Sequence, residues 1–193
     1  MKFSYYIIIL QLLNGFMAVG QEDKGLHILV ADSTWGKEII PFPIDWAPKV
    51  TLSGFEELRF APNWSKPESD TFWSLVMAWK VDMDEPLSSK DVGVNIKGYF
   101  DGLMKPNHWA TKFPDPEVSL LETDTELSYT GSMKLFDGFY TGKVIQLNFE
   151  AKQFWCPRLK QSVLIIWCSP QERSHKIWQK LKEVYVQTDF CSN

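Results

Sequence analysis

Few residues of this chain have the types and spacing that catalysis or metal binding requires. The sequence contains no Gly-x-Ser-x-Gly elbow, no His-Glu-x-x-His motif, no phosphate-binding loop, no dinucleotide glycine fingerprint and no Cys-x-x-Cys pair. Its three histidines, His27, His108 and His175, lie far apart, whereas zinc sites usually take two ligands from one local element. The sequence therefore predicts no catalytic residue set, no metal ion and no cofactor.

One histidine leaves an enzymatic alternative open. His108 lies in the proline-rich segment 105–118, which is predicted to be a loop. There it could act as a base with a nearby carboxylate such as Asp101 or Asp115. The alternative is a small secreted hydrolase, whereas the simpler interpretation is an exposed loop histidine.

Three acidic residues, Asp82, Asp84 and Glu85, could offer oxygen ligands to a calcium ion. A calcium-binding loop of the EF-hand type needs glycine at its sixth position and glutamate at its twelfth. Counted from Asp82, those positions hold Leu87 and Gly93. We therefore interpret this segment as a solvated turn whose acids suit the N-terminus of the helix that follows.

The tryptophans are the remaining candidates for ligand binding. Four lie on predicted buried faces, where core packing explains them: Trp73, Trp79, Trp167 and Trp178. Four others lie in predicted loops, where an indole can stack on a ligand or cover a sheet edge: Trp35, Trp46, Trp64 and Trp109. Trp64, His108 and Trp109 are the candidate ligand-binding residues.

The first twenty residues have the features of a secretory signal peptide. Lys2 is followed by an apolar run at 5–13 and by the small residues Ala18 and Gly20. The run is too short to span a bilayer, which takes about 20 residues. We expect cleavage after about Gly20 and a secreted or periplasmic protein with no transmembrane segment after cleavage. In a eukaryotic source, the Asn63-Trp64-Ser65 sequon would be a glycosylation site.

The remaining segment, 21–193, is predicted to form a single domain. The chain is 45% hydrophobic and contains nine Trp, thirteen Phe and six Tyr, which supports a sizeable core and excludes extensive disorder. Its formal net charge of −4 argues against nucleic acid, whose phosphates attract basic surfaces.

Alternating hydrophobicity predicts an antiparallel sheet. One face of the segment 72–81 carries Trp73, Leu75, Met77, Trp79 and Val81. The segments 127–135 and 145–151 alternate in the same way. The segment 163–167 is apolar on both parities, which predicts a central strand covered on both faces. Prolines 41, 43 and 48 keep most of the stretch before residue 49 out of central strands.

A helix is predicted over 89–104. Ser88 is placed to cap it and Asp91 lies at the third helical position, close to a capping box. Gly93 and Gly98 lower the intrinsic stability of the helix. We therefore expect both glycines to pack closely against the sheet.

A second helix is predicted at the C-terminus. It would open at Ser169, with proline at the first helical position and glutamate at the third, and its apolar stripe runs to Tyr185. The predicted fold class is α+β, a mostly antiparallel sheet with helices packed on it, including this C-terminal helix.

The three cysteines allow one intramolecular disulfide. If the last two strands form a hairpin, the predicted register sets Cys168 opposite Ala151. Cys156 is then roughly 17 Å away, beyond the about 7 Å that a disulfide can bridge. A C-terminal helix antiparallel to the last strand would return Cys191 toward Cys156. We therefore predict a Cys156–Cys191 disulfide and a buried free thiol at Cys168.

Short motifs at both ends resemble PsbP-like domains. They are the Phe-Pro-Ile-Asp-Trp run at 42–46 before a strand at 54–62, and the apolar strand 163–167 before a Ser-Pro-Gln-Glu helix start at 169–172. In element order the resemblance covers most of the chain after the predicted signal peptide. It implies an antiparallel sheet between helices and a non-enzymatic accessory or binding role, and no site residue is carried over from it.

The leading functional hypothesis is a secreted or periplasmic, non-catalytic domain that binds an unknown protein or small ligand. It follows from the predicted signal peptide and from the lack of a catalytic set. The hydrolase built on His108 is one alternative, and an interaction subunit of an envelope complex is another.

Overall fold

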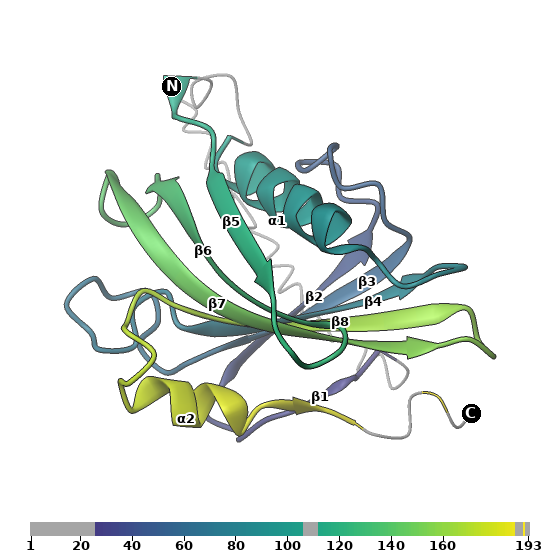
Figure 1. Ribbon diagram of the computed structural model, residues 1–193. Helices are drawn as coiled ribbons and strands as arrows, with labels where there is room; N and C mark the ends of the chain where they lie inside the picture. Colours follow the sequence, from purple (N-terminus) through teal and green to yellow (C-terminus); the bar gives the residue numbers. More distant parts are fainter. Residues whose placement is uncertain (1–25, 106–111, 188–190, 192–193) are drawn as a thin grey trace, which may run out of the picture.

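A seven-stranded antiparallel sheet organises the chain (Figure 1). The structure, a computed structural model, describes residues 26–105, 112–187 and 191. The strands lie in the order β2-β3-β4-β8-β7-β6-β5. Their bounds are β2 Gly36–Phe42, β3 Gly54–Phe60, β4 Leu75–Asp82, β5 Glu117–Glu122, β6 Ser128–Asp137, β7 Lys143–Cys156 and β8 Gln161–Ser169. Two meanders, β2 to β4 and β5 to β8, join where β4 pairs with β8.

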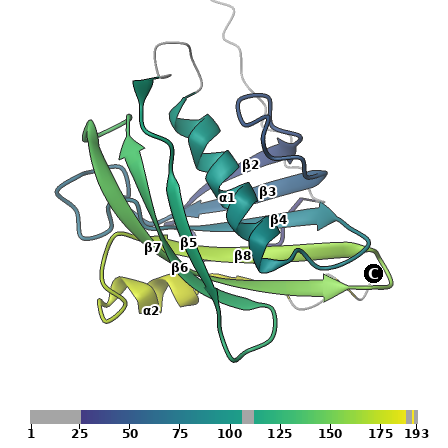
Figure 2. The same cartoon turned by 45° about the horizontal axis from the view of Figure 1, so that its top comes forward.

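Helix α1 (Ser89–Met104) connects β4 to β5 and lies across one face of the sheet (Figure 2). Strands β5 to β7 curve toward the same side, so the helix rests in the hollow of a bent sheet. Side chains of one strand parity, such as Leu58 and Met77, pack here against Ile96 and Phe100 of the helix. This face holds the larger of the two hydrophobic cores.

The opposite face of the sheet carries a second, smaller core. It is covered by the short helix α2 (Ile177–Lys182) and by the strand pair β1 (Leu29–Val30) and β9 (Tyr185–Val186) (Figure 1). Val76 of β4 and Ile165 of β8 are buried beneath this layer. Because both faces are covered, β4 and β8 are apolar on both parities. The segment 163–167 lies in the middle strand of the seven, so the prediction of a central strand is confirmed.

The predicted α+β fold class is wrong. Strands hold 41% of the described residues and helices 15%, so the fold is mostly β, a sandwich-like antiparallel sheet. The error comes from the C-terminal segment, where the sequence predicts one long helix and the structure has a strand end, a turn, six helical residues and another strand.

Ser169 is the last residue of β8 and does not cap a helix. Its hydroxyl bonds the Ser74 hydroxyl at 2.9 Å and accepts the Gln171 backbone N–H at 3.2 Å, so it supports a turn. The predicted apolar stripe is buried as far as Val184. The apolar side chains of this stripe therefore stay buried through the helix and the turn after it, although the backbone becomes extended at Tyr185.

The helix over 89–104 is confirmed, with the same bounds. The Ser88 hydroxyl oxygen accepts the Asp91 N–H at 3.2 Å and donates to the Asp91 carboxylate at 2.6 Å. The expectation that its glycines pack on the sheet is wrong. A Cβ on Gly93 would face open space, and Gly98 and Gly102 face the loop at 46–49. The close approach of α1 is therefore to the loop at 46–49 and not to the sheet.

The predicted hairpin of the last two long strands exists, but its register is shifted by two residues. Cys168 lies opposite Phe149, and Ala151 lies opposite Ile166. The turn between β7 and β8 is tighter than expected, because Cys156 already pairs with Gln161.

The structure contains the Cys156–Cys191 disulfide, with Cα atoms 5.6 Å apart. Cys168 is free and buried. The return of the chain toward Cys156 is made by α2 followed by the extended β9, and not by the long helix that the sequence suggested. The predicted signal peptide lies outside the described residues. In the described part of the chain, no helix has the length and apolar character needed to cross a membrane.

Candidate functional site

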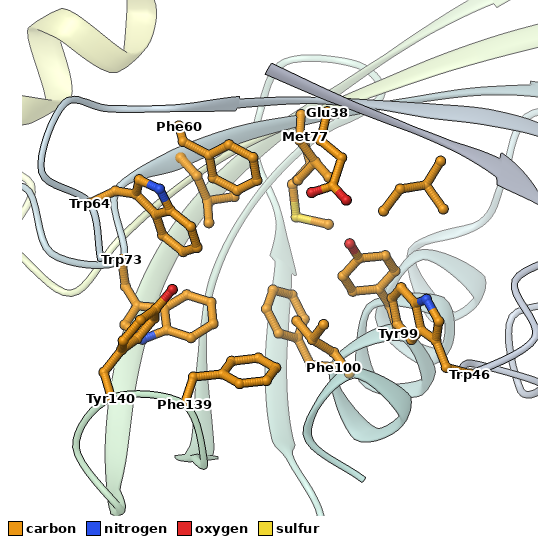
Figure 3. Close-up of a pocket in the computed structure, with 14 residues that line it drawn as sticks. Glu38, Trp46, Phe60, Trp64, Trp73, Met77, Tyr99, Phe100, Phe139 and Tyr140 are labelled. Carbon is orange, nitrogen blue, oxygen red and sulfur yellow. The ribbon is translucent and has the colours of Figure 1, made fainter. Parts of the chain in front are cut away.

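An aromatic pocket of about 380 Å³ opens between α1 and the sheet (Figure 3). Its floor comes from β2, β3 and β4, one wall comes from α1, and the turn between β6 and β7 closes the other side. Eight of its lining residues are aromatic: Trp46, Phe60, Trp64, Trp73, Tyr99, Phe100, Phe139 and Tyr140. Apart from Glu38, the others are Ile40, Leu58, Leu75, Met77 and Leu103.

One end of the pocket is a cluster of packed rings. Trp64 stacks on Phe60 with ring centroids 4.4 Å apart and meets Trp73 and Tyr140 edge to face at 5.8 and 5.7 Å. A turn with a positive φ of 64° at Asn63 sets the direction of Trp64. The Trp64 carbonyl then accepts the Trp73 N–H at 2.8 Å. The loop between β3 and β4 therefore presents two indoles side by side.

The turn at the pocket mouth is held by one buried carboxylate. Asp137 accepts hydrogen bonds from the backbone N–H groups of Phe139, Tyr140 and Thr141 and from the Thr141 hydroxyl, at 2.8–3.2 Å. This network fixes the backbone that carries Phe139 and Tyr140. Their side chains line the pocket although they are 52% and 38% exposed. Two large aromatic side chains therefore stand at the entrance.

The other end of the pocket is formed by α1 and the loop before β3. Trp46 meets Tyr99 edge to face at 5.1 Å. The Trp46 backbone lies so close to Gly102 that a side chain at that position would strike it. Gly102 therefore allows the helix and the Trp46 loop to approach, and this approach sets the Trp46 ring against Tyr99.

One carboxyl group lines this second end of the pocket, and another is buried near it. Among the described residues that line the pocket, Glu38 is the only charged one, and its side chain and the Tyr99 hydroxyl point toward the same space in Figure 3. Glu56 is fully buried behind them, where it accepts the indole N–H of Trp79 at 2.8 Å. Burial raises the pKa of Glu56 to about 8. Burial, and then the neighbouring Glu56, hold the pKa of Tyr99 well above its usual value.

The predicted site residues meet different outcomes. Trp64 lines the pocket. His108 and Trp109 lie outside the described residues. Asp101 and Asp115, the carboxylates proposed to assist His108, both pair with the Lys105 ammonium, and Asp101 also binds Lys49 at 2.7 Å.

Most of the pocket was missed by sequence reasoning. Trp73 was predicted as core, and it is buried, but it also lines the pocket. Phe139 and Tyr140 follow an Asp-Gly turn signal, and two aromatics in such a turn were an available sign of a binding surface. The sequence also contained a sign that Glu56 is unusual, because it belongs to an acidic pair inside a hydrophobic strand.

Across the described segments there is no group of three or more His, Cys, Asp or Glu residues that could hold a metal ion. Of the acidic residues weighed as calcium ligands, Asp84 pairs with Lys160 at 2.8 Å and Asp82 accepts the side-chain amide of Gln161 at 2.9 Å.

No family model, no curated protein and no solved structure matches the chain. The resemblance to PsbP-like domains therefore stays a prediction.

Proposed function

We propose that the chain is an exported binding protein for a small, largely apolar ligand that enters the aromatic pocket. The observation that carries this proposal is the pocket itself, about 380 Å³ lined by eight aromatic side chains. Ligand sites are typically concave and apolar with few polar groups, and they span roughly 300–1,000 Å³. A single carboxylate in an aromatic wall fits that description.

The entrance supports the same proposal. Phe139 and Tyr140 are large apolar groups held at the mouth by the Asp137 network, where they remain partly exposed. Exposed aromatics beside a cavity gain contact area when a ligand covers them. Export is supported by the predicted signal peptide and by the Cys156–Cys191 disulfide, because disulfides persist in oxidising compartments.

The test is binding of N-phenyl-1-naphthylamine, a neutral probe whose fluorescence rises in apolar surroundings. We expect saturable binding by the folded protein and at least about fivefold weaker binding by Trp64→Ala and Tyr140→Ala, because each loses one aromatic face. Tyr185→Ala is the matched control for Tyr140→Ala, since Tyr185 is 51% exposed on β9, across the sheet from the pocket.

Circular dichroism and thermal unfolding would establish that each variant is folded. Equal loss of probe binding in the Tyr140 and Tyr185 variants would show nonspecific surface binding. No saturable binding by the folded wild-type protein would overturn the proposal.

A further inference from the structure

We infer that the ligand of this pocket is an organic cation, an aromatic or aliphatic body carrying an ammonium group that is held beside Glu38 and Tyr99. This inference rests on the proposed function and specifies its ligand class.

The charge on the described part of the pocket wall is negative only. Among the described lining residues, Glu38 is acidic, none is basic, and the others are aliphatic or aromatic. The nearest basic residues on β2 and β3 belong to the opposite strand parity. Lys37 contacts His27 at 2.6 Å, and Arg59 is paired with Glu57 at 2.6 Å. In the described part of the chain, Glu38 forms no salt bridge.

The strand register places a second carboxyl group on the same face. Glu38 lies opposite Leu58, and Ile40 lies opposite Glu56, so the two glutamates are diagonal neighbours on adjacent strands. Such neighbours are roughly 7–8 Å apart and interact across the face of the sheet. Burial raises the pKa of Glu56 to about 8, which favours its protonated, uncharged form at neutral pH. An anionic ligand at this end would lie beside the acidic side chain of Glu38, and none of the described lining residues is a basic residue that could pair with it.

The rings supply the other half of a cation site. Trp46 and Tyr99 meet edge to face beside Glu38, and the Tyr99 hydroxyl points toward the space that the Glu38 carboxylate faces (Figure 3). A cation within about 6 Å of an aromatic face is attracted to it, most strongly when it is desolvated. The stacked rings of Phe60 and Trp64 at the far end would hold the apolar body.

The experiment compares three ligands with one naphthalene body and three charges: 1-naphthylmethylamine, 1-naphthalenemethanol and 1-naphthoate. Isothermal titration calorimetry at pH 7 measures each affinity. We expect the amine to bind about tenfold more tightly than the alcohol, and the carboxylate to bind most weakly.

The variant Glu38→Gln should weaken binding of the amine about three- to fivefold, because Glu38 is exposed on its edge strand, while changing that of the alcohol less than about twofold. Glu68→Gln, which changes an exposed glutamate that does not line the pocket, is the matched control and should change neither. Equal affinity for the amine and the alcohol, or an amine affinity that does not respond to Glu38→Gln, would overturn the inference of a cation.

Binding of the neutral probe distinguishes a failure of the proposed binding function from a failure of the proposed ligand class. If N-phenyl-1-naphthylamine binds and the amine has no advantage, the pocket is a binding site but the ligand class is wrong. If neither the probe nor any naphthyl ligand binds the folded protein, the proposed function fails and the inference fails with it.

Discussion

The indole N–H of Trp79 donates a 2.8 Å hydrogen bond to the Glu56 carboxyl group, and both side chains are completely buried. The two residues are direct neighbours across β3 and β4. This hydrogen bond offsets part of the free-energy cost of burying a carboxyl group in the larger core. The cost of burial is still the larger effect, and it raises the pKa of Glu56 to about 8, against an ordinary value of 4.5.

This burial predicts a pH-dependent stability. Between about pH 4.5 and 8 the folded protein holds a proton at Glu56 that the unfolded chain has released. The free energy of unfolding therefore decreases as pH rises through this window, and the stabilising contribution of the protonated group is complete only below it. Glu56→Gln removes the titration, so we expect the decrease in stability between pH 5 and pH 8 to be smaller by about 2–4 kcal/mol.

Urea unfolding of wild type and Glu56→Gln at several pH values measures this difference. Other carboxyl groups contribute equally to both proteins and cancel in the comparison. Glu68→Gln should keep the wild-type pH dependence, because Glu68 is exposed. Parallel stability curves for wild type and Glu56→Gln would contradict the prediction.

The adjacent acid, Glu57, attaches the N-terminal strand to the sheet. Its carboxylate, buried on the other face, accepts the N–H groups of Ile28 and Leu29 at 2.7 and 3.1 Å and pairs with Arg59. Glu57→Ala would leave a partly buried guanidinium and two amides without this acceptor, at a cost of about 3–5 kcal/mol.

Chemical unfolding measures that cost, and amide hydrogen exchange locates it. We expect the Ile28 and Leu29 amides to exchange much faster in Glu57→Ala. Glu57→Gln keeps an oxygen acceptor and should lie between wild type and Glu57→Ala. Unchanged protection of both amides would show that β1 does not depend on Glu57.

Replacement of glycine by alanine should have opposite effects on stability at two positions of α1. A methyl group on Gly93 would meet open space, so Gly93→Ala should stabilise the protein by about 0.5–1 kcal/mol through helix propensity. A methyl group on Gly102 would lie 2.6 Å from the Ala47 Cα. Gly102→Ala should therefore destabilise the protein by about 1–3 kcal/mol.

Each glycine variant is the control for the other, since both change the same residue type in one helix. Gly102→Ala should also weaken probe binding, because the displaced backbone carries Trp46. Equal changes in thermal stability for the two variants would show that contact with the Trp46 loop has no energetic consequence.

The disulfide predicts a large loss on its removal. Its two cysteines are 35 positions apart, and a loop of that size contributes about 3–4 kcal/mol in the chain-entropy description. The variant Cys156→Ala/Cys191→Ala should lose about that much stability. Cys168→Ala removes a buried sulfur but no crosslink, so it should lose only about 1 kcal/mol.

Thiol titration tests the same assignment independently. Burial raises the pKa of Cys168 to about 12, so the native protein should not react with a thiol reagent and the denatured, unreduced protein should expose one thiol. Three reactive thiols in the unreduced denatured protein would show that no disulfide forms.

Several elements could be predicted from the sequence because their signals are local. The helix over 89–104 follows from a cap at Ser88 and a repeating apolar face, all within a few turns of one another. The central position of 163–167 follows from apolar residues on both parities. The cysteine pairing followed from export, strand spacing and chain reach, although the register it assumed was shifted by two residues.

The C-terminal segment shows where local signals stop. The residues 169–185 carry a helix-start motif and a helical apolar stripe, yet six of them, Ile177–Lys182, form the helix α2. The Ser169 hydroxyl is hydrogen-bonded to the hydroxyl of Ser74, just before β4, and Tyr185 pairs with Val30 of β1. Tertiary partners from distant parts of the chain decided the backbone there, because their hydrogen bonds outweigh helix propensity.

The pocket was decided by tertiary structure alone. Glu38, Trp64, Tyr99 and Tyr140 come from an edge strand, a loop, a helix and a turn that lie far apart in sequence. They meet because the sheet bends around α1 and because strand register sets which parity faces the hollow. The sequence by itself determined which residues are apolar and which strands alternate. It could not determine the cavity between them, since a cavity is a relation among elements, set by the curvature of the sheet and the approach of the helix.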